Sequence, residues 1–146
     1  MGSLRPVAAV AVDLDGALGD TRRLWRDWLE DAGRRARVDV TALDEELPNW
    51  RQLLQRFAEE RAPVYLRPDA EASAALRRLH GAGTRIGVFT DAPEELARVA
   101  LAQLGAARRV EAVETGPDAL ERLVARFGDD VRVVRSRAEL VALRLR

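Results

Sequence analysis

The chain of 146 residues contains no cysteine and no lysine, and it has a single histidine. The lack of cysteine excludes disulfide bonds and thiolate metal ligands. The 24 basic side chains are all arginine and are matched by 24 acidic ones, so the net charge is zero. A balanced charge provides neither the basic surface that nucleic-acid binding needs nor an acidic tail. We therefore expect no nucleic-acid partner.

Long hydrophobic runs are also missing. No apolar stretch approaches the length that crosses a membrane, and the N-terminal residues MGSLRP contain no long apolar segment of the kind found in signal peptides. These absences predict a cytoplasmic protein with no membrane partner. The apolar content of 47% in 146 residues is sufficient for one domain with a hydrophobic core.

Short apolar runs alternate with stretches of helical periodicity. This alternation predicts right-handed strand–helix–strand units and a parallel sheet, which is an α/β fold. Prolines and glycines lie at the expected ends of the helices; among them, Pro63 is expected to end a helix and Pro117 to begin one. The predicted strands are residues 7–12, 85–90, 110–113 and 131–134, and a last helix follows Ser136 to the end of the chain.

The connection between the first two strands is too long for one helix. It contains two apolar stripes at helical spacing and all three tryptophans of the chain, which we interpret as packing residues. We predict a small helical cap inserted into an α/β core. The cap comprises residues 20–66, and the core comprises residues 1–19 and 67–146.

Two carboxylates follow the first strand, and a hydroxyl ends the second. Asp13 and Asp15 are followed by Gly16, and Thr90 closes the segment RIGVFT. Ligands bind at the carboxyl ends of strands in open parallel sheets, so neighbouring strands would bring these groups to one crevice. There, one carboxylate could attack a phosphoryl group while the other protonates the leaving oxygen. The hydroxyl and the backbone N–H groups of the glycine turn could hold phosphate oxygens.

The segment AVAVDLDGAL resembles the first motif of the haloacid dehalogenase (HAD) superfamily, and RIGVFTDAP resembles its second motif. The resemblance extends over nearly the whole chain and implies a three-layer Rossmann-like core with strand order 3-2-1-4 and a cap after the first motif. It also implies that Asp13 is the nucleophile and that Asp15 is the general acid and base. Asp13 and the backbone carbonyl of Asp15 would contact Mg²⁺, and Thr90, Asp91 and Gly16 would bind phosphate. An acid at position 15 favours a phosphatase over a dehalogenase.

The chain departs from the third motif of that family. The motif normally supplies a lysine, but the stretch VETGPDALERL has Glu114, Thr115 and Gly116 at this place. No lysine elsewhere in the chain can replace it. Arginine could supply the charge but not a compact point donor. Within the first motif, Ala17 stands where the family usually has Thr or Val.

The departure from the fourth motif is larger. The stretch VRVVRSRAEL places Arg135 and Ser136 where the family has a metal-binding acid, with Glu139 as a candidate second acid. Mg²⁺ prefers oxygen ligands and usually needs one or two carboxylates. A guanidinium about 4 Å away would repel a divalent ion by roughly 8 kcal/mol near a protein surface. Millimolar affinity amounts to only about 4 kcal/mol, so such a repulsion would abolish it.

Three hypotheses remain open from the sequence. In the first, the chain descends from Mg²⁺-dependent phosphomonoester phosphatases but is a pseudoenzyme that needs no cofactor, and Arg135 replaces the charge of the metal. In the second, it is an active phosphatase for a small phosphorylated molecule, with Glu139 or Glu114 holding Mg²⁺ beside Asp13 and Asp15. In the third, it has an assembly role: family members commonly add a fifth strand, whose absence here would expose a sheet edge for a homodimer.

Overall fold

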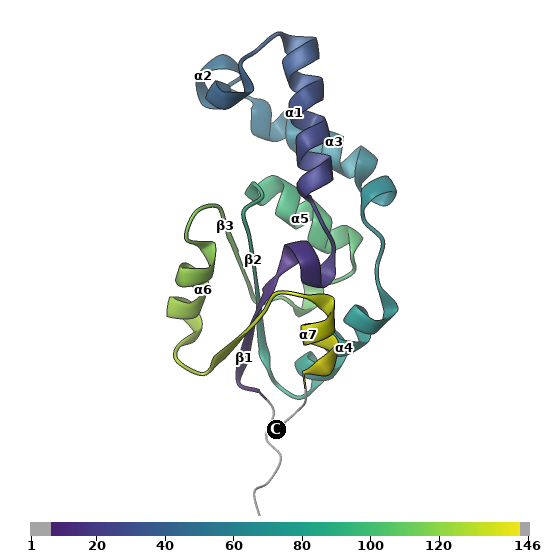
Figure 1. Ribbon diagram of the computed structural model, residues 1–146, viewed down its shortest axis with the longest axis vertical. Helices are drawn as coiled ribbons and strands as arrows, with labels where there is room; N and C mark the ends of the chain where they lie inside the picture. The colour runs from purple at the N-terminus through teal and green to yellow at the C-terminus, as the bar shows by residue number, and fades with distance from the viewer. Residues whose placement is uncertain (1–6, 144–146) are drawn as a thin grey trace, which may run out of the picture.

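The computed structural model describes residues 7–143, and at its centre lies a four-stranded parallel sheet (Figure 1). The order of the strands is β3-β2-β1-β4, which confirms the predicted α/β fold class. Val12 of β1 is the register partner of Val88 on one side and of Val134 on the other. The strands are β1 (Ala9–Asp13), β2 (Arg85–Thr90), β3 (Ala112–Thr115) and β4 (Val131–Val134).

Helices cover both faces of this sheet and make three layers. On one face, α4 (Ala70–Gly81), α5 (Glu94–Gln103) and α7 (Arg137–Ala142) pack on the Val10 and Val12 side of β1. The other face is covered by α6 (Ala119–Phe127), which packs against Ala11 and Phe89. Because β1 is central and buried on both faces, it carries only small and β-branched apolar residues before Asp13.

The helical cap lies beyond the carboxyl ends of the strands (Figure 1). It consists of α1 (Arg22–Ala36), the short α2 (Leu43–Glu46) and α3 (Trp50–Tyr65), with a 3₁₀ turn before α2 (Val40–Ala42). The rings of Trp25, Trp28 and Trp50 lie 5.6 to 6.0 Å apart between these helices. Stacked and tilted aromatic pairs at this separation are favourable, so the tryptophans form the packed interior of the cap.

Several predicted element boundaries were wrong. Helix α3 continues through Pro63 to Tyr65 rather than ending at the proline. This is tolerated because Pro63 lies in the exposed last turn, where one missing backbone hydrogen bond has little effect. Helix α6 begins at Ala119, after Asp118, rather than at Pro117.

Two strands are also shifted by two residues from their predicted starts. They begin at Ala9 and Ala112, because strand limits are set by pairing with neighbours, and Gly87 of β2 pairs with Ala112. The last helix was predicted to run to the end of the chain, but it ends at Ala142 and Leu143 is already extended. Residues 144–146 lie outside the described part of the chain.

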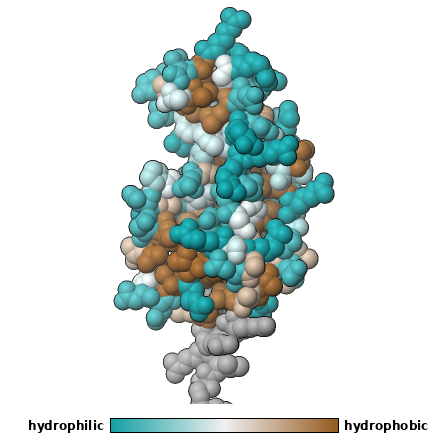
Figure 2. Space-filling view, viewed as in Figure 1, coloured by the Kyte–Doolittle hydropathy of each residue, from teal (hydrophilic) through white to brown (hydrophobic). Residues whose placement is uncertain are grey.

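The β4 strand is an edge of the sheet within residues 7–143. Its Val133 side chain is 38% exposed, and Figure 2 shows apolar side chains gathered over the α/β core on the face in view. A homodimer through this edge stays a prediction. Among the described helices, none combines the length and the apolarity that a membrane crossing requires.

Candidate active site

A tight turn follows β1 and places its two carboxylates. Asp13 is the last residue of β1, and residues Leu14–Leu18 form one wide helical turn, η1, in which Gly16 has a φ of +117°. A Cβ atom at Gly16 would lie 2.7 Å from the carbonyl oxygen of Arg135. Glycine is needed here both for the left-handed backbone and for this close approach. The Gly16 N–H donates to the carbonyl of Gly19 at 2.8 Å and so closes the turn.

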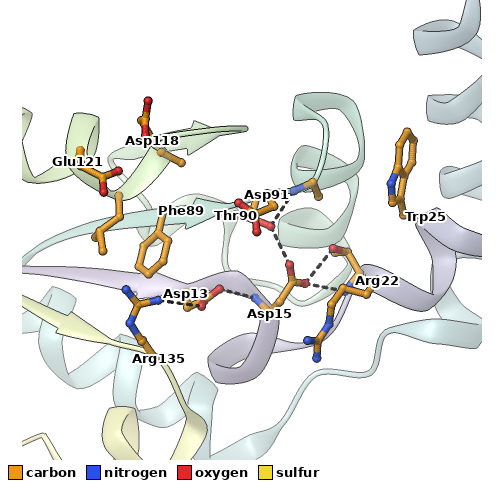
Figure 3. A pocket seen from close by; sticks show the side chains of 14 residues that line it. Asp13, Asp15, Arg22, Trp25, Phe89, Thr90, Asp91, Asp118, Glu121 and Arg135 are labelled. Atoms are coloured by element: carbon orange, nitrogen blue, oxygen red, sulfur yellow. Dashed lines mark hydrogen bonds and ion pairs between the residues drawn. The ribbon is translucent and has the colours of Figure 1, made fainter. Parts of the chain in front are cut away.

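The Asp15 carboxylate connects three parts of the molecule (Figure 3). Its Oδ1 accepts hydrogen bonds from the Thr21 N–H at 2.7 Å and from the Thr21 hydroxyl at 2.8 Å. Its Oδ2 accepts from the Thr90 hydroxyl at 2.8 Å, and that hydroxyl accepts from the Ala92 N–H at 3.1 Å. Thr21 precedes the first cap helix and Thr90 ends β2, so Asp15 joins the cap to the core.

The Asp13 carboxylate faces an arginine. Its Oδ1 accepts from the Asp15 N–H at 3.1 Å, and its Oδ2 lies 3.9 Å from Nη1 of Arg135 (Figure 3). The Arg135 guanidinium also lies over the Phe89 ring, 5.4 Å from its centroid. Partial burial raises the pKa of Asp13 above its ordinary value of 3.8, and the charge of Arg135 opposes this shift.

These groups open into a cavity of about 370 Å³ between the core and the cap. Its walls include five carboxylates and two guanidinium groups, an excess of three negative charges when all are ionised. Three of the carboxylates, those of Asp91, Asp118 and Glu121, belong to exposed residues at the rim. Trp25 of helix α1 forms part of the wall on the cap side (Figure 3).

No lysine lies at the end of β3, and the two nearby arginines form ion pairs away from the cavity. Arg122 of helix α6 pairs with Glu114 at 2.9 Å and donates to the carbonyls of Thr115 and Pro117. Arg126 pairs with the second oxygen of Glu114 at 3.3 Å. Arg122, Arg126 and Glu114 therefore hold α6 against β3, and none of the three lines the cavity.

The side chains present do not fit a Mg²⁺ site. Glu139 caps α7: its Oε1 accepts from the Arg135 N–H at 3.2 Å and from the Ser136 hydroxyl at 3.3 Å, and it does not line the cavity. Within residues 7–143, no group of three or more His, Cys, Asp or Glu side chains is arranged to hold a metal ion. The Asp13 carboxylate, which a metal would need, has a guanidinium beside it.

No protein-family model and no curated protein sequence matches this chain. Solved structures do match. A Thermotoga maritima protein described as a beta-phosphoglucomutase superposes with a TM-score of 0.55 at 21% identity, covering 86% of this chain and 74% of that one. A dehalogenase in an intermediate complex superposes with a TM-score of 0.52 at 13% identity, covering 91% of this chain and 78% of the other. These likenesses show that the chain shares the fold of both proteins.

Within this fold, the structure brings most of the predicted site residues to one cavity. Asp13, Asp15, Thr90, Asp91 and Arg135 all line it. Gly16 and Glu139 do not: the first shapes the turn behind the cavity, and the second caps a helix. Sequence reasoning missed Thr21, Arg22, Trp25, Phe89, Asp118 and Glu121.

Two of the missed cavity residues had a local signal. Thr21 directly precedes the first helix of the cap, where threonine is a preferred N-cap residue. Trp25 lies one turn further along the same helix. The other missed residues come from segments far apart in the chain, so only the folded structure brings them to the cavity.

Proposed function

We propose that this chain is a HAD-type protein descended from Mg²⁺-dependent phosphomonoester phosphatases and that its phosphatase turnover is weak or absent. The observation that carries the proposal is the Arg135 guanidinium, 3.9 Å from the Asp13 carboxylate. A metal-dependent phosphatase uses a cation at this carboxylate to draw phosphate toward the nucleophile. Here the cation is the Arg135 side chain, which, unlike a metal ion, has no coordination sites for phosphate oxygens.

The hydrogen bonds of Asp15 support the same conclusion. The Thr21 N–H and the hydroxyls of Thr21 and Thr90 all contact its two oxygens, so in this arrangement the carboxylate is held by the cap and by β2 and is not directed at a leaving group. The single proton of the Thr90 hydroxyl is used by Asp15 and is not directed at a ligand. The excess of three negative charges on the cavity wall also disfavours a phosphate dianion.

The test is hydrolysis of a panel of small phosphomonoesters with and without Mg²⁺, with Asp13→Asn as the control. We expect the wild-type rate to equal that of Asp13→Asn or to exceed it only slightly, with no increase on adding Mg²⁺. Mg²⁺-dependent hydrolysis that Asp13→Asn abolishes would overturn the proposal.

The alternative is an active phosphatase, and it is favoured by the convergence of Asp13, Asp15 and Thr90 at one cavity. In this case Asp13 attacks phosphorus, the bond to the leaving oxygen breaks, and that oxygen keeps the electron pair and takes a proton from Asp15. Water then attacks the phosphorus of the aspartyl-phosphate and gives a proton back to Asp15, which releases inorganic phosphate and restores the Asp13 carboxylate. Asp15 must first take up a proton and reorganise its bonds to Thr21 and Thr90. A phosphoryl group found on the Asp13 peptide by mass spectrometry after a rapid acid quench would establish this alternative.

A further inference from the structure

We infer that Arg135 occupies the cation position beside Asp13, so that the cavity excludes divalent metal ions. The inference deepens the proposed function and rests on it. It concerns what the cavity binds, whereas the proposed function concerns turnover.

The backbone of Arg135 is held from two sides. Its N–H donates to Glu139 Oε1 at 3.2 Å, and its carbonyl oxygen lies against Gly16, where even a methyl group would come within 2.7 Å. The preceding residue, Val134, is buried and in register with Val12 of the central strand. The side chain of Arg135 therefore starts from a fixed point beside the end of β1.

The guanidinium is also directed toward Asp13. It lies 3.9 Å from the Asp13 carboxylate and over the face of Phe89 (Figure 3). A planar, weakly hydrated guanidinium suits an aromatic face better than an ammonium group does. Arg22, the other cation of the cavity wall, is instead paired twice with Asp20, at 2.6 and 2.8 Å. In the described part of the chain, Arg135 is thus the cation that serves Asp13.

A divalent ion would have few ligands to gain from displacing Arg135. The Asp15 carboxylate is occupied by Thr21 and Thr90, and the Glu139 carboxylate is bound to the start of helix α7. Asp13 would be left as a single carboxylate ligand next to a tethered positive charge. Mg²⁺ is usually held by one or two carboxylates together with water or substrate phosphate, and the positive charge of Arg135 beside the single remaining carboxylate opposes such a site.

The inference predicts that replacing Arg135 by an acid creates a metal site. The experiment uses the full chain and measures tryptophan-sensitised luminescence of Tb³⁺, with Mg²⁺ as competitor; Trp25 on the cavity wall is the donor. We expect Arg135→Asp to bind Tb³⁺ at least about tenfold more tightly than the wild type. The gain should disappear in Arg135→Asp combined with Asp13→Asn.

Arg132→Asp is the matched control, because it makes the same change of charge on β4, three residues before Arg135. Arg132 is exposed, is in register with Val10 and does not line the cavity, so this variant should bind Tb³⁺ as the wild type does. Circular dichroism checks that each variant is folded. A folded Arg135→Asp protein without a gain in affinity would overturn the inference.

A second comparison does not depend on an introduced metal site, so it tests the inference even if Arg135→Asp does not fold. Wild type and Asp13→Asn should bind Tb³⁺ equally weakly. Tighter binding by the wild type, released by Mg²⁺, would overturn the inference whatever the turnover. Conversely, hydrolysis that persists without any metal would overturn the proposed loss of turnover and leave the inference intact.

Discussion

The Thr90 hydroxyl donates a hydrogen bond of 2.8 Å to Asp15 Oδ2, although the two residues are 75 positions apart. Thr90 is 2% exposed and ends β2, whereas Asp15 belongs to the turn after β1. Through Thr21, which binds the other oxygen of Asp15, the same carboxylate also holds the start of the cap. Asp15, which was expected to act as the general acid and base, therefore also has a structural role.

Replacing Thr90 by valine should destabilise the protein by about 1 to 3 kcal/mol, because it removes the donor to Asp15 and leaves the Ala92 N–H without its acceptor. Urea unfolding measures the effect. Thr115→Val is the matched control: Thr115 ends the neighbouring strand β3, and no side-chain hydrogen bond of its hydroxyl is found among the described residues. The prediction fails if both substitutions change stability equally.

Gly16→Ala should unfold the protein or destabilise it by at least about 2 kcal/mol, since a φ of +117° is strained for alanine and the added Cβ would lie 2.7 Å from a backbone oxygen. Gly81→Ala provides the comparison. Gly81 closes helix α4 with no atom within 4 Å of the added methyl group, so this change should be neutral or mildly stabilising. Thermal unfolding of the two variants separates these outcomes, and equal melting temperatures would contradict the prediction.

The difference in free energy of unfolding between Asp13→Asn and the wild type should favour the variant more at about pH 7 than at acid pH. Burial raises the pKa of Asp13 in the folded protein, so the folded state binds this proton more tightly than the unfolded chain does. The free energy of unfolding therefore falls as the pH rises from the unfolded value of 3.8 through the higher folded one. Asparagine removes this pH-dependent loss.

The measurement is urea unfolding of both proteins between about pH 3.5 and pH 7. The stability difference should shrink as the pH falls toward and below 3.8. Asp129→Asn, at an exposed position before the edge strand β4, should show no such trend. A difference that is constant with pH would show that burial of the Asp13 charge does not matter.

Trp28→Ala should destabilise the cap by about 3 to 5 kcal/mol, because Trp28 is 3% exposed and lies against both other tryptophans. Loss of tryptophan packing should appear in the near-ultraviolet circular dichroism before the sheet unfolds. Val64→Ala, at a side chain that is 75% exposed on helix α3, should change stability by less than about 0.5 kcal/mol. Equal effects of the two substitutions would argue against a tryptophan-centred cap.

Much of the fold could be predicted from residues that act locally. The run of small and β-branched residues before Asp13 indicates a buried parallel strand. Asp69 and Ser136, residue types that favour helix starts, cap the helices that follow them. Pro63 misled the prediction because a local rule for helix ends ignores that an exposed last turn tolerates a missing hydrogen bond. Strand limits were missed because they depend on the register of a neighbour.

The sequence by itself determined which chemical groups stand at the ends of the strands, because a strand end and a glycine turn are local features. It therefore indicated Asp13, Asp15 and Thr90 together, and it placed an arginine at position 135. Only the tertiary structure decided how these groups are used. Asp15 binds Thr21 and Thr90, and Arg135 reaches Asp13, because packing of the cap and pairing of β4 with β1 set distances that no local pattern encodes.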